Sequence, residues 1–448
     1  MSQSYSYDFD QVEREFGVVF DPAPNKISQF AGLAPFIAFL KKGRFRERLS
    51  AEFGDEKART ILQFALGVIA GADRMKGVAR AGQDVLLRSY LKNAIGEAQL
   101  ARDFKSFTKT ELERLHEWVT SLAILELVQE IPQSEDLIFD VDATSVIKHG
   151  EQEGVELGYI EKDKLDDCYQ YLFFRLHNLN TFVYGTIRGG AAHSQNGICD
   201  YLERFLPMFK AHWKTKWRMD SGYFNEQSFD IFSENDATFY VKAPMSPTRL
   251  GMALHSPALV WVVPDPKQPD VQYASMTTKT EKGTLWREVF KRVRKKNQQL
   301  SLLESVEYRY DAIATNDLNT TEHDVFLFYN GRANIENNIR EFKADYSLGK
   351  IVTESFDAND AITQATLLTY LLMSHFKRKL LPTEMRRSQL RTMRTYVFNI
   401  PGRLLSSARR QILRLHNVFR DGAFYSFIFY HLKRLRSWVL EPPEFQTT

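Results

Sequence analysis

Residues 329–343 read YNGRANIENNIREFK, and four side chains in this stretch follow a Tyr-x₂-Arg-x₃-Glu-x₆-Lys spacing. An α-helix turns by about 100° per residue, so Tyr329, Arg332, Glu336 and Lys343 would project within an arc of about 60°. A neighbouring stripe of the same helix is apolar, which predicts packing on a core. Its members are Phe328, Ile335, Ile339 and Phe342. One carboxylate beside an arginine, a lysine and a tyrosine suits a site that holds a metal ion and phosphate groups.

The same spacing has a simpler interpretation. Arg332 and Glu336 are four residues apart, which is the spacing of an ordinary ion pair on a helix surface. The acid lies C-terminal to the base, which is the weaker of the two orientations. Spacing alone does not decide between a surface pair and a functional site.

The stretch resembles the signature of the DDE transposases of bacterial insertion sequences, and all four positions match without a gap. The resemblance implies a ribonuclease-H-like catalytic core in which Glu336 is the third of three carboxylates. It also implies two catalytic aspartates on strands upstream. The agreement extends over about residues 130–375 and is looser at both ends of the chain.

Two aspartates are candidates for the first of these carboxylates. Residues 137–147 read LIFDVDATSVI, a β-branched and aromatic alternation that predicts a strand. Asp140 and Asp142 would share one face, and buried carboxylates need a cation or donors. The family places its first aspartate before small or hydroxyl residues, so the resemblance favours Asp142. Asp140 remains the alternative, and aspartates on a surface strand are the plain interpretation.

The second carboxylate is expected at Asp220. It ends a strand-like run in KTKWRMDSGYF, residues 214–224, although an aspartate before glycine is also ordinary turn chemistry. Upstream, residues 171–179 and 181–190 predict an antiparallel hairpin, and residues 195–210 predict a helix. The order of strand, hairpin, helix and strand matches a ribonuclease-H-like core, which favours the catalytic assignment.

The interval between Asp220 and Glu336 is longer than a minimal core needs. Several strand-like runs fall within residues 245–318, which we interpret as a β-rich insertion domain like those of many transposases of this group. Trp261 and Trp286 lie inside it. A tryptophan there can stack on a flipped DNA base, and this role is assigned to Trp286 with Trp261 as the alternative. For either residue a place in the core is the simpler interpretation.

The chain has 448 residues, so two to four domains are expected, in a mixed α/β fold. Residues 1–131 predict a helical N-terminal region, which by resemblance recognises DNA ends. Residues 132–244 and 319–377 form the two parts of the catalytic core, on either side of the insertion. Residues 378–448 are rich in arginine and are expected to form a basic helical region that contacts phosphates.

Composition excludes several other classes of protein. With only Cys168 and Cys199, and no CxxC pair, the sequence argues against a structural zinc site and indicates a reducing compartment. The N-terminal MSQSYSYDFDQVEREF is polar and acidic, unlike a signal peptide. The apolar run at residues 30–40 is about half a membrane span. We therefore expect a cytoplasmic bacterial protein that joins the nucleoid when it binds DNA.

The resemblance implies that Asp142, Asp220 and Glu336 bind two Mg²⁺ ions, for which Mn²⁺ can substitute, because carboxylate oxygens prefer hard cations. Arg332 and Lys343 would hold DNA phosphates. Tyr329 would position a phosphate by a hydrogen bond or by packing, which completes the set of expected site residues.

The function expected from these residues is cut-and-paste transposition. The partners would be double-stranded DNA at the terminal inverted repeats and in the target, bound by a homodimer. Two alternatives remain open: a ribonuclease-H-like nuclease or resolvase without strand transfer, and a domesticated DNA-binding protein that has lost catalysis. Intact carboxylates at all three positions argue against the second alternative.

Overall fold

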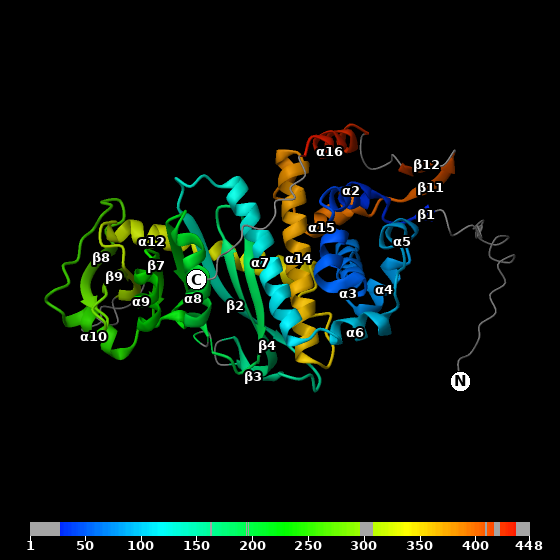
Figure 1. Ribbon diagram of the computed structural model, residues 1–448. Coiled ribbons are helices and arrows are strands. Elements are labelled where there is room, and N and C mark those ends of the chain that lie inside the picture. Colours follow the sequence, from blue (N-terminus) through cyan, green and yellow to red (C-terminus); the bar gives the residue numbers. More distant parts are fainter. Residues whose placement is uncertain are drawn as a thin grey trace, which may run out of the picture.

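The computed structural model describes residues 27–161, 164–193, 195, 197–295, 308–407, 410–415 and 422–435. In these ranges one nine-stranded sheet runs through the centre of the molecule (Figure 1). Its middle strands follow the order β5-β4-β2-β6-β7. Their bounds are Leu137–Ile147 for β2, Lys164–Leu176 for β4, Thr181–Arg188 for β5, Thr215–Met219 for β6 and Thr238–Ala243 for β7.

Strand direction identifies this part of the sheet as the predicted core. Strands β2, β4 and β5 pair antiparallel, whereas β2, β6 and β7 pair parallel. Parallel neighbours need crossover connections, which helices α8 (Ile198–Lys210) and α9 (Glu226–Glu234) supply here. The order and the directions confirm the expected ribonuclease-H-like arrangement within a mixed α/β fold.

One long apolar helix joins the sheet to the N-terminal helices. Helix α14 (Phe356–Leu380) is buried along most of its length and lies between the sheet and helix α3 (Phe45–Ala70), with α7 (Lys109–Glu130) beside it and also against the sheet (Figure 1). Its Gln364 side chain donates to the carbonyl of Gly185 on β5 at 2.8 Å. This helix therefore closes the core on that face, as its unbroken apolar pattern predicts.

The N-terminal region is helical apart from one short strand. Four further helices accompany α3 and α7: α2 (Ala34–Lys42), α4 (Met75–Gly82), α5 (Val85–Leu91) and α6 (Glu97–Lys105). A capping box begins α7, since Thr108 Oγ1 accepts from Glu111 N at 3.3 Å and Glu111 Oε2 accepts from Thr108 N at 2.9 Å. None of the helices in the described ranges is long and apolar enough to cross a bilayer.

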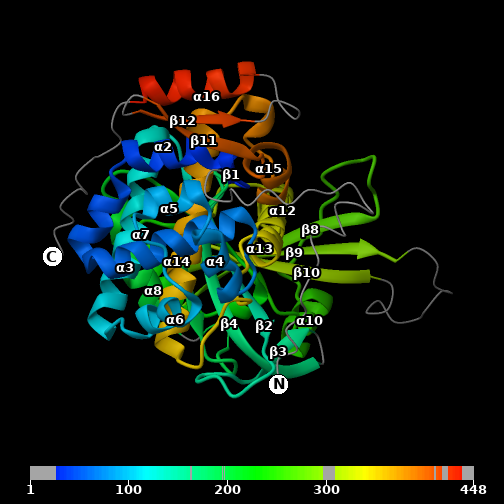
Figure 2. The same cartoon turned by 90° about the vertical axis from the view of Figure 1, so that its right-hand side faces the viewer.

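The predicted insertion is β-rich, but its strands continue the core sheet. Strands β8 (Val271–Lys279), β9 (Leu285–Arg294) and β10 (Tyr308–Thr315) form an antiparallel ribbon. Because β10 also pairs antiparallel with β7, the ribbon extends the sheet sideways, as Figure 2 shows. Helix α10 (Pro247–His255) precedes this ribbon.

The C-terminal region is not all helical, contrary to expectation. Strands β11 (Gly402–Ser407) and β12 (Arg410–Leu415) form a hairpin, and β1 (Ile27–Ser28) adds to its edge (Figure 2). Arginine and leucine are good helix formers, but the six residue pairs of the hairpin, extended by two pairs with the distant β1, override that local preference. Beyond the hairpin, within residues 422–435, α16 (Gly422–Arg434) is helical. Residues 408–409, 416–421 and 436–448 of this basic region lie outside the described ranges.

Candidate active site

Two neighbouring parallel strands place Asp142 and Asp220 beside each other. Strands β2 and β6 pair in parallel register as far as Val141 with Met219; Asp142 is the next residue of β2, which continues to Ile147, and Asp220 is the residue that follows the end of β6. Residues that follow a paired position on adjacent parallel strands stay neighbours, so these carboxylates lie together where β6 ends. Asp220 also accepts from Ser221 N at 2.6 Å, which caps the short 3₁₀ turn that follows the strand.

The predicted signature helix is broken by a tighter turn. Helix α12 (Glu322–Asn330) carries Tyr329, a 3₁₀ turn at Gly331–Ala333 carries Arg332, and α13 (Asn334–Asp345) carries Glu336 and Lys343. The expectation of one continuous α-helix is therefore wrong. The apolar stripe is confirmed on α13, where its side chains are buried. They are Ile335, Ile339 and Phe342.

Arg332 links the two halves of the site. Its Nη1 lies 3.4 Å from Asp142 Oδ2, and its Nη2 lies 3.4 Å from Glu336 Oε1. The Arg332 side chain is only 13% exposed, whereas that of Glu336 is 56% exposed. An arginine held this far from solvent between a strand and a helix is more than a surface ion pair. The geometry brings Asp142 and Glu336 to one guanidinium, although distant parts of the chain supply them.

The charge state of Asp142 reflects its neighbours. Burial, together with the charges of Asp220 and Glu336, raises the pKa of its carboxyl to about 6, and Arg332 opposes that shift. The Asp142 carboxyl thus responds to both other carboxylates, so all three share one electrostatic environment. A site with more negative than positive charge in contact is one that a cation stabilises.

Lys343 and Tyr329 flank this cluster from opposite ends of the signature segment. Lys343 Nζ donates to the Ser145 carbonyl of β2 at 2.7 Å. Burial lowers the pKa of Lys343, and the charge of Asp142 opposes the change. Burial raises the pKa of the Tyr329 phenol, which Arg332 opposes. The pKa values of both side chains thus depend on the charges of the site.

Asp140, the alternative first carboxylate, has different partners. Its Oδ2 accepts from Arg175 Nη1 at 2.7 Å, and its Oδ1 accepts from Arg218 Nε at 2.6 Å. All three side chains are almost completely buried. Of the two candidates, Asp142 therefore lies with Asp220 and Glu336, and Asp140 belongs to a buried charged triad.

Sequence reasoning did not single out the two arginines of this triad. A signal was present, because Arg175 and Arg218 each interrupt an apolar strand, in YLFFRLHNL and KWRMD. An arginine within a buried strand requires a buried acid beside it. Searching for that acid on the neighbouring strand would have found Asp140.

The structure places Trp286 in the core. Its indole is 3% exposed and packs edge-on against Phe229, with ring centroids 5.2 Å apart. In this position it presents no open face to a DNA base. Trp261 is partly exposed and stacks under the Arg292 guanidinium at 4.3 Å. The burial of Trp286 fits the simpler interpretation, in which this residue belongs to the core.

The donor chemistry of the cluster fits divalent metal ions. Three carboxylates, whose oxygens are hard donors, lie in one electrostatic environment, and two of them form ion pairs with the Arg332 guanidinium. As the side chains now stand, no three Asp, Glu, His or Cys groups of the described ranges are close enough to share one ion. Loading would thus require Asp142 and Glu336 to exchange their contact with Arg332 for the metal.

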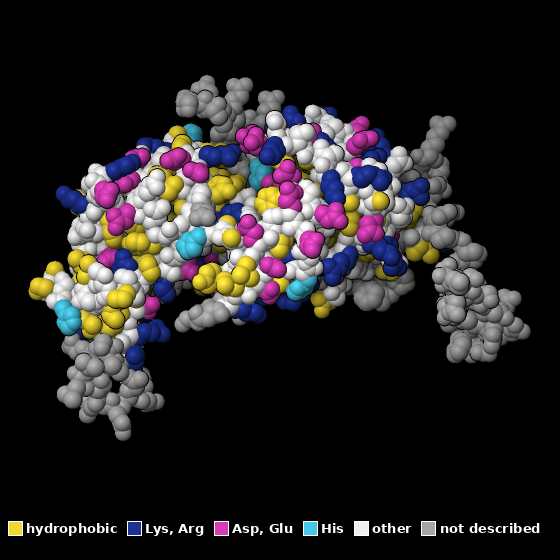
Figure 3. Space-filling model, turned by 90° about the horizontal axis from the view of Figure 1, so that it is seen from below, with side chains coloured by type: hydrophobic (Ala, Val, Ile, Leu, Met, Phe, Trp, Pro, Cys, Tyr) yellow, Lys and Arg dark blue, Asp and Glu magenta, His cyan; other side chains and the backbone are white. Residues whose placement is uncertain are grey.

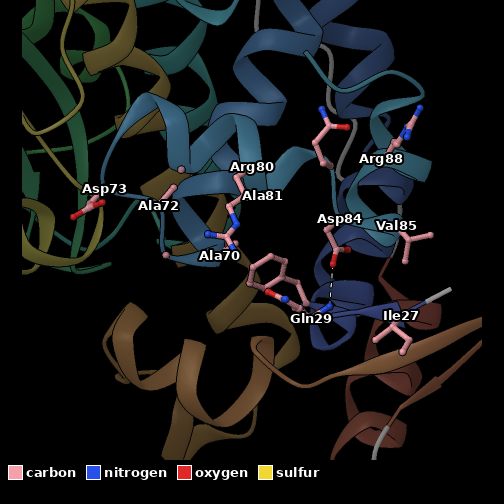
Figure 4. Close-up of a pocket in the computed structure, with 14 residues that line it drawn as sticks. Ile27, Gln29, Ala70, Ala72, Asp73, Arg80, Ala81, Asp84, Val85 and Arg88 are labelled. Carbon is pink, nitrogen blue, oxygen red and sulfur yellow. Dashed lines mark hydrogen bonds between the residues drawn. The ribbon is translucent and has the colours of Figure 1, made fainter. Parts of the chain in front are cut away.

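A pocket of about 710 Å³ lies elsewhere, among the N-terminal helices (Figure 4). Arg80, Arg88, Asp73 and Asp84 are among its lining residues, and none of the three site carboxylates is. Figure 3 shows the molecule from below, with basic and acidic side chains interspersed over the described part of that face. This face has no continuous basic track for DNA among those residues.

Comparison with known proteins gives two findings. The family model described as transposase DDE domain group 1 matches residues 27–437. Among solved structures, the cryo-EM structure of a piggyBac transposase synaptic complex with hairpin DNA is similar over 82% of this chain and 80% of that chain, at 10% identity and a TM-score of 0.40. A search of curated proteins gave no match.

Proposed function

The chain belongs to the DDE transposases of group 1, and from this premise we propose that it performs cut-and-paste transposition. In this proposal it cleaves double-stranded DNA at the terminal inverted repeats of a bacterial insertion sequence. It then joins the 3′ ends to target DNA, acting as a homodimer in the DNA complex. Asp142, Asp220 and Glu336 are its catalytic carboxylates.

One observation carries the proposal. Arg332 contacts Asp142 and Glu336 together at 3.4 Å, and Asp220 ends the strand beside Asp142. Bringing several carboxylates together away from water costs free energy, which a bound cation offsets. Such a cluster therefore indicates a cation-binding site. Arg332 and Glu336 also stand at the spacing of the transposase signature, which links their geometry to one reaction.

Each residue has a separate task. Asp142, Asp220 and Glu336 would hold Mg²⁺ or Mn²⁺, which when bound supplies nucleophile activation and stabilisation of the leaving oxygen. Arg332, once released from the carboxylates, pairs with a DNA phosphate, since a guanidinium matches phosphate geometry. Lys343 adds a second positive charge near the same phosphates. Tyr329 limits water and positions a phosphate from the other side of Arg332.

The test is a nicking and joining assay on an end-labelled terminal-repeat duplex. Wild-type protein with Mg²⁺ should nick the duplex and join its 3′ end to target DNA, and should do neither without a divalent ion. Glu336→Gln keeps the size of the side chain but removes its charge, so it should bind the duplex and lose both steps by several orders of magnitude.

Two results would count against the proposal. Nicking by Glu336→Gln at nearly the wild-type rate would remove Glu336 from the catalytic set. Nicking by the wild type without any joining would favour the nuclease or resolvase alternative.

A further inference from the structure

Arg218 is a buried arginine with partners on β2, on α12 and at His177, which follows β4 and also contacts Arg175. Arg218 lies on β6 two residues before Asp220, and its side chain is 3% exposed. Its Nε donates to Asp140 Oδ1 at 2.6 Å, and its Nη1 donates to the Phe328 carbonyl at 2.9 Å. The guanidinium also lies 5.0 Å from the centre of the Phe328 ring.

These contacts reach the strand that carries Asp142 and the helix that precedes the segment with Glu336. Asp140 is two residues before Asp142 on β2, and Phe328 is in the last turn of α12, immediately before the segment with Arg332 and Glu336. One guanidinium therefore joins β2 and β6 to the start of the signature segment. A planar group with five donors in a fixed arrangement suits such a joint, because its hydrogen bonds fix direction as well as distance.

Gly331 supplies an independent observation of this joint. Its backbone has φ −60° and ψ −17°, ordinary helical values that any residue adopts. A Cβ at this position would nevertheless collide with Nη1 of Arg218. Glycine at residue 331 thus makes room for the Arg218 guanidinium, because the backbone conformation alone does not require glycine there.

We propose that Arg218 is a positioning residue, which sets the distance between Glu336 on the signature segment and the two aspartates at the strand ends. The inference rests on the proposed function of those carboxylates. Arg218 touches no metal or DNA itself. It acts through Asp140 on one side and through the Phe328 carbonyl on the other.

Arg175 provides a matched control. It is as buried as Arg218 and donates to the other oxygen of the same Asp140 at 2.7 Å. Its other hydrogen bonds go to Asn180 and His177, at the turn after β4, and not to α12. Arg175→Met therefore removes one charge from the triad, as Arg218→Met does, but leaves the contact with the signature segment intact.

The experiment measures Mn²⁺ binding to the full chain by the loss of the free-ion EPR signal, together with thermal unfolding. Arg218→Met removes the contact that fixes the signature segment, so it should weaken Mn²⁺ binding by about tenfold, the lower end of the effect of groups that orient metal ligands. Arg175→Met should lower the melting temperature similarly and keep the affinity within about threefold of wild type.

Gly331→Ala disturbs the same contact between Arg218 and the signature segment, but it removes no charge. It should reproduce the weakened Mn²⁺ binding of Arg218→Met, although alanine is the better helix former. In an Arg218→Lys background the lysine has no Nη1 to displace, so Gly331→Ala should cost nothing further. This non-additivity is a result that general destabilisation does not produce.

The outcomes distinguish failure of the proposed function from failure of the positioning role of Arg218. If Asp142→Asn leaves Mn²⁺ binding as it is in the wild type, the proposed function fails. If binding depends on Asp142 but is unchanged in Arg218→Met and Gly331→Ala, only the positioning role is overturned. Equal loss in Arg175→Met would also overturn it, because loss of charge in the triad would then explain the effect.

Discussion

Asp140 and Asp142 lie two residues apart on β2, yet Asp140 is enclosed by Arg175 and Arg218 whereas Asp142 shares Arg332 with Glu336. The strand thus uses two neighbouring aspartates for separate purposes. Asp140 joins strands β2, β4 and β6 through buried ion pairs. Asp142 instead belongs to the proposed metal site, where its Oδ2 faces Arg332.

This difference predicts opposite phenotypes for two similar substitutions. Asp140→Asn should lower the free energy of unfolding by about 3–5 kcal/mol, because it leaves buried arginines unpaired. Asp142→Asn should change stability by less than about 1 kcal/mol but abolish nicking and Mn²⁺ binding. Denaturant unfolding and metal titration of both variants provide the measurements. If Asp140→Asn were stable but had lost Mn²⁺ binding, Asp140 would be the metal ligand and Asp142 the structural residue.

A second prediction concerns DNA binding by the signature segment. Arg332→Ala and Lys343→Ala should each weaken binding of a terminal-repeat duplex and reduce the salt dependence of binding by about one ion, because each removes one phosphate contact. The measurement is a titration of labelled duplex at several salt concentrations.

Arg204 is a suitable control for this titration, because it is 65% exposed on α8, away from the cluster. Arg204→Ala should bind as the wild type does. If the wild type and the three variants all showed the same salt dependence, Arg332 and Lys343 would not contact phosphates and would have structural roles alone.

A third prediction distinguishes the two interpretations of Trp286. As a core residue packed on Phe229, its replacement by alanine should cost about 3–5 kcal/mol of unfolding free energy. Trp286→Phe should recover most of this loss. Should Trp286→Ala instead retain stability and lose binding of hairpin DNA, the base-stacking assignment would be restored. Thermal unfolding and a binding titration with hairpin and linear duplexes decide the matter.

The fourth prediction is a pH dependence at the turn before α12. Asp317 accepts hydrogen bonds from Thr320 Oγ1 at 2.6 Å and from Tyr240 Oη at 2.7 Å. Burial raises the pKa of this carboxyl, but the hydrogen bonds outweigh burial and lower it to about 2. Because the folded pKa is depressed, the resulting stability is present above pH 4 and is lost as the pH falls through 2.

Asp317→Asn should therefore be less stable than wild type by about 1 kcal/mol at pH 7, after allowance for partial solvent screening. The difference should close between pH 4 and pH 2. Unfolding by denaturant at several pH values measures it, and a gap that stayed constant down to pH 2 would contradict the assigned cause.

Local sequence was sufficient for much of the site. The strand of Asp142, the strand before Asp220 and the helical stretch of Glu336 followed from local patterns, whereas the choice of these three carboxylates rested on the resemblance to the family. The 3₁₀ turn at Gly331 did not, because the guanidinium that favours glycine there comes from β6. The burial of Trp286 was also a tertiary result, since Phe224 and Phe229 enclose it.

The C-terminal hairpin shows the same limit more strongly. Residues 402–415 have a composition that suits a helix, and the strand that completes their sheet is Ile27–Ser28. No pattern within either segment identifies the other. Prediction from local preference fails where a pairing is this remote in sequence.

That pairing also orders the events of synthesis. When the N-terminal helices leave the ribosome, Ile27 and Ser28 still lack their partners, because β11 begins only at Gly402. Gly32 also lacks a partner at that stage, since its amide donates to the Ile400 carbonyl at 3.3 Å. Closing so long a loop adds little further entropy cost, but it delays completion of the fold. The N-terminal region therefore cannot complete its hydrogen bonds until the residues around 400 have been synthesised.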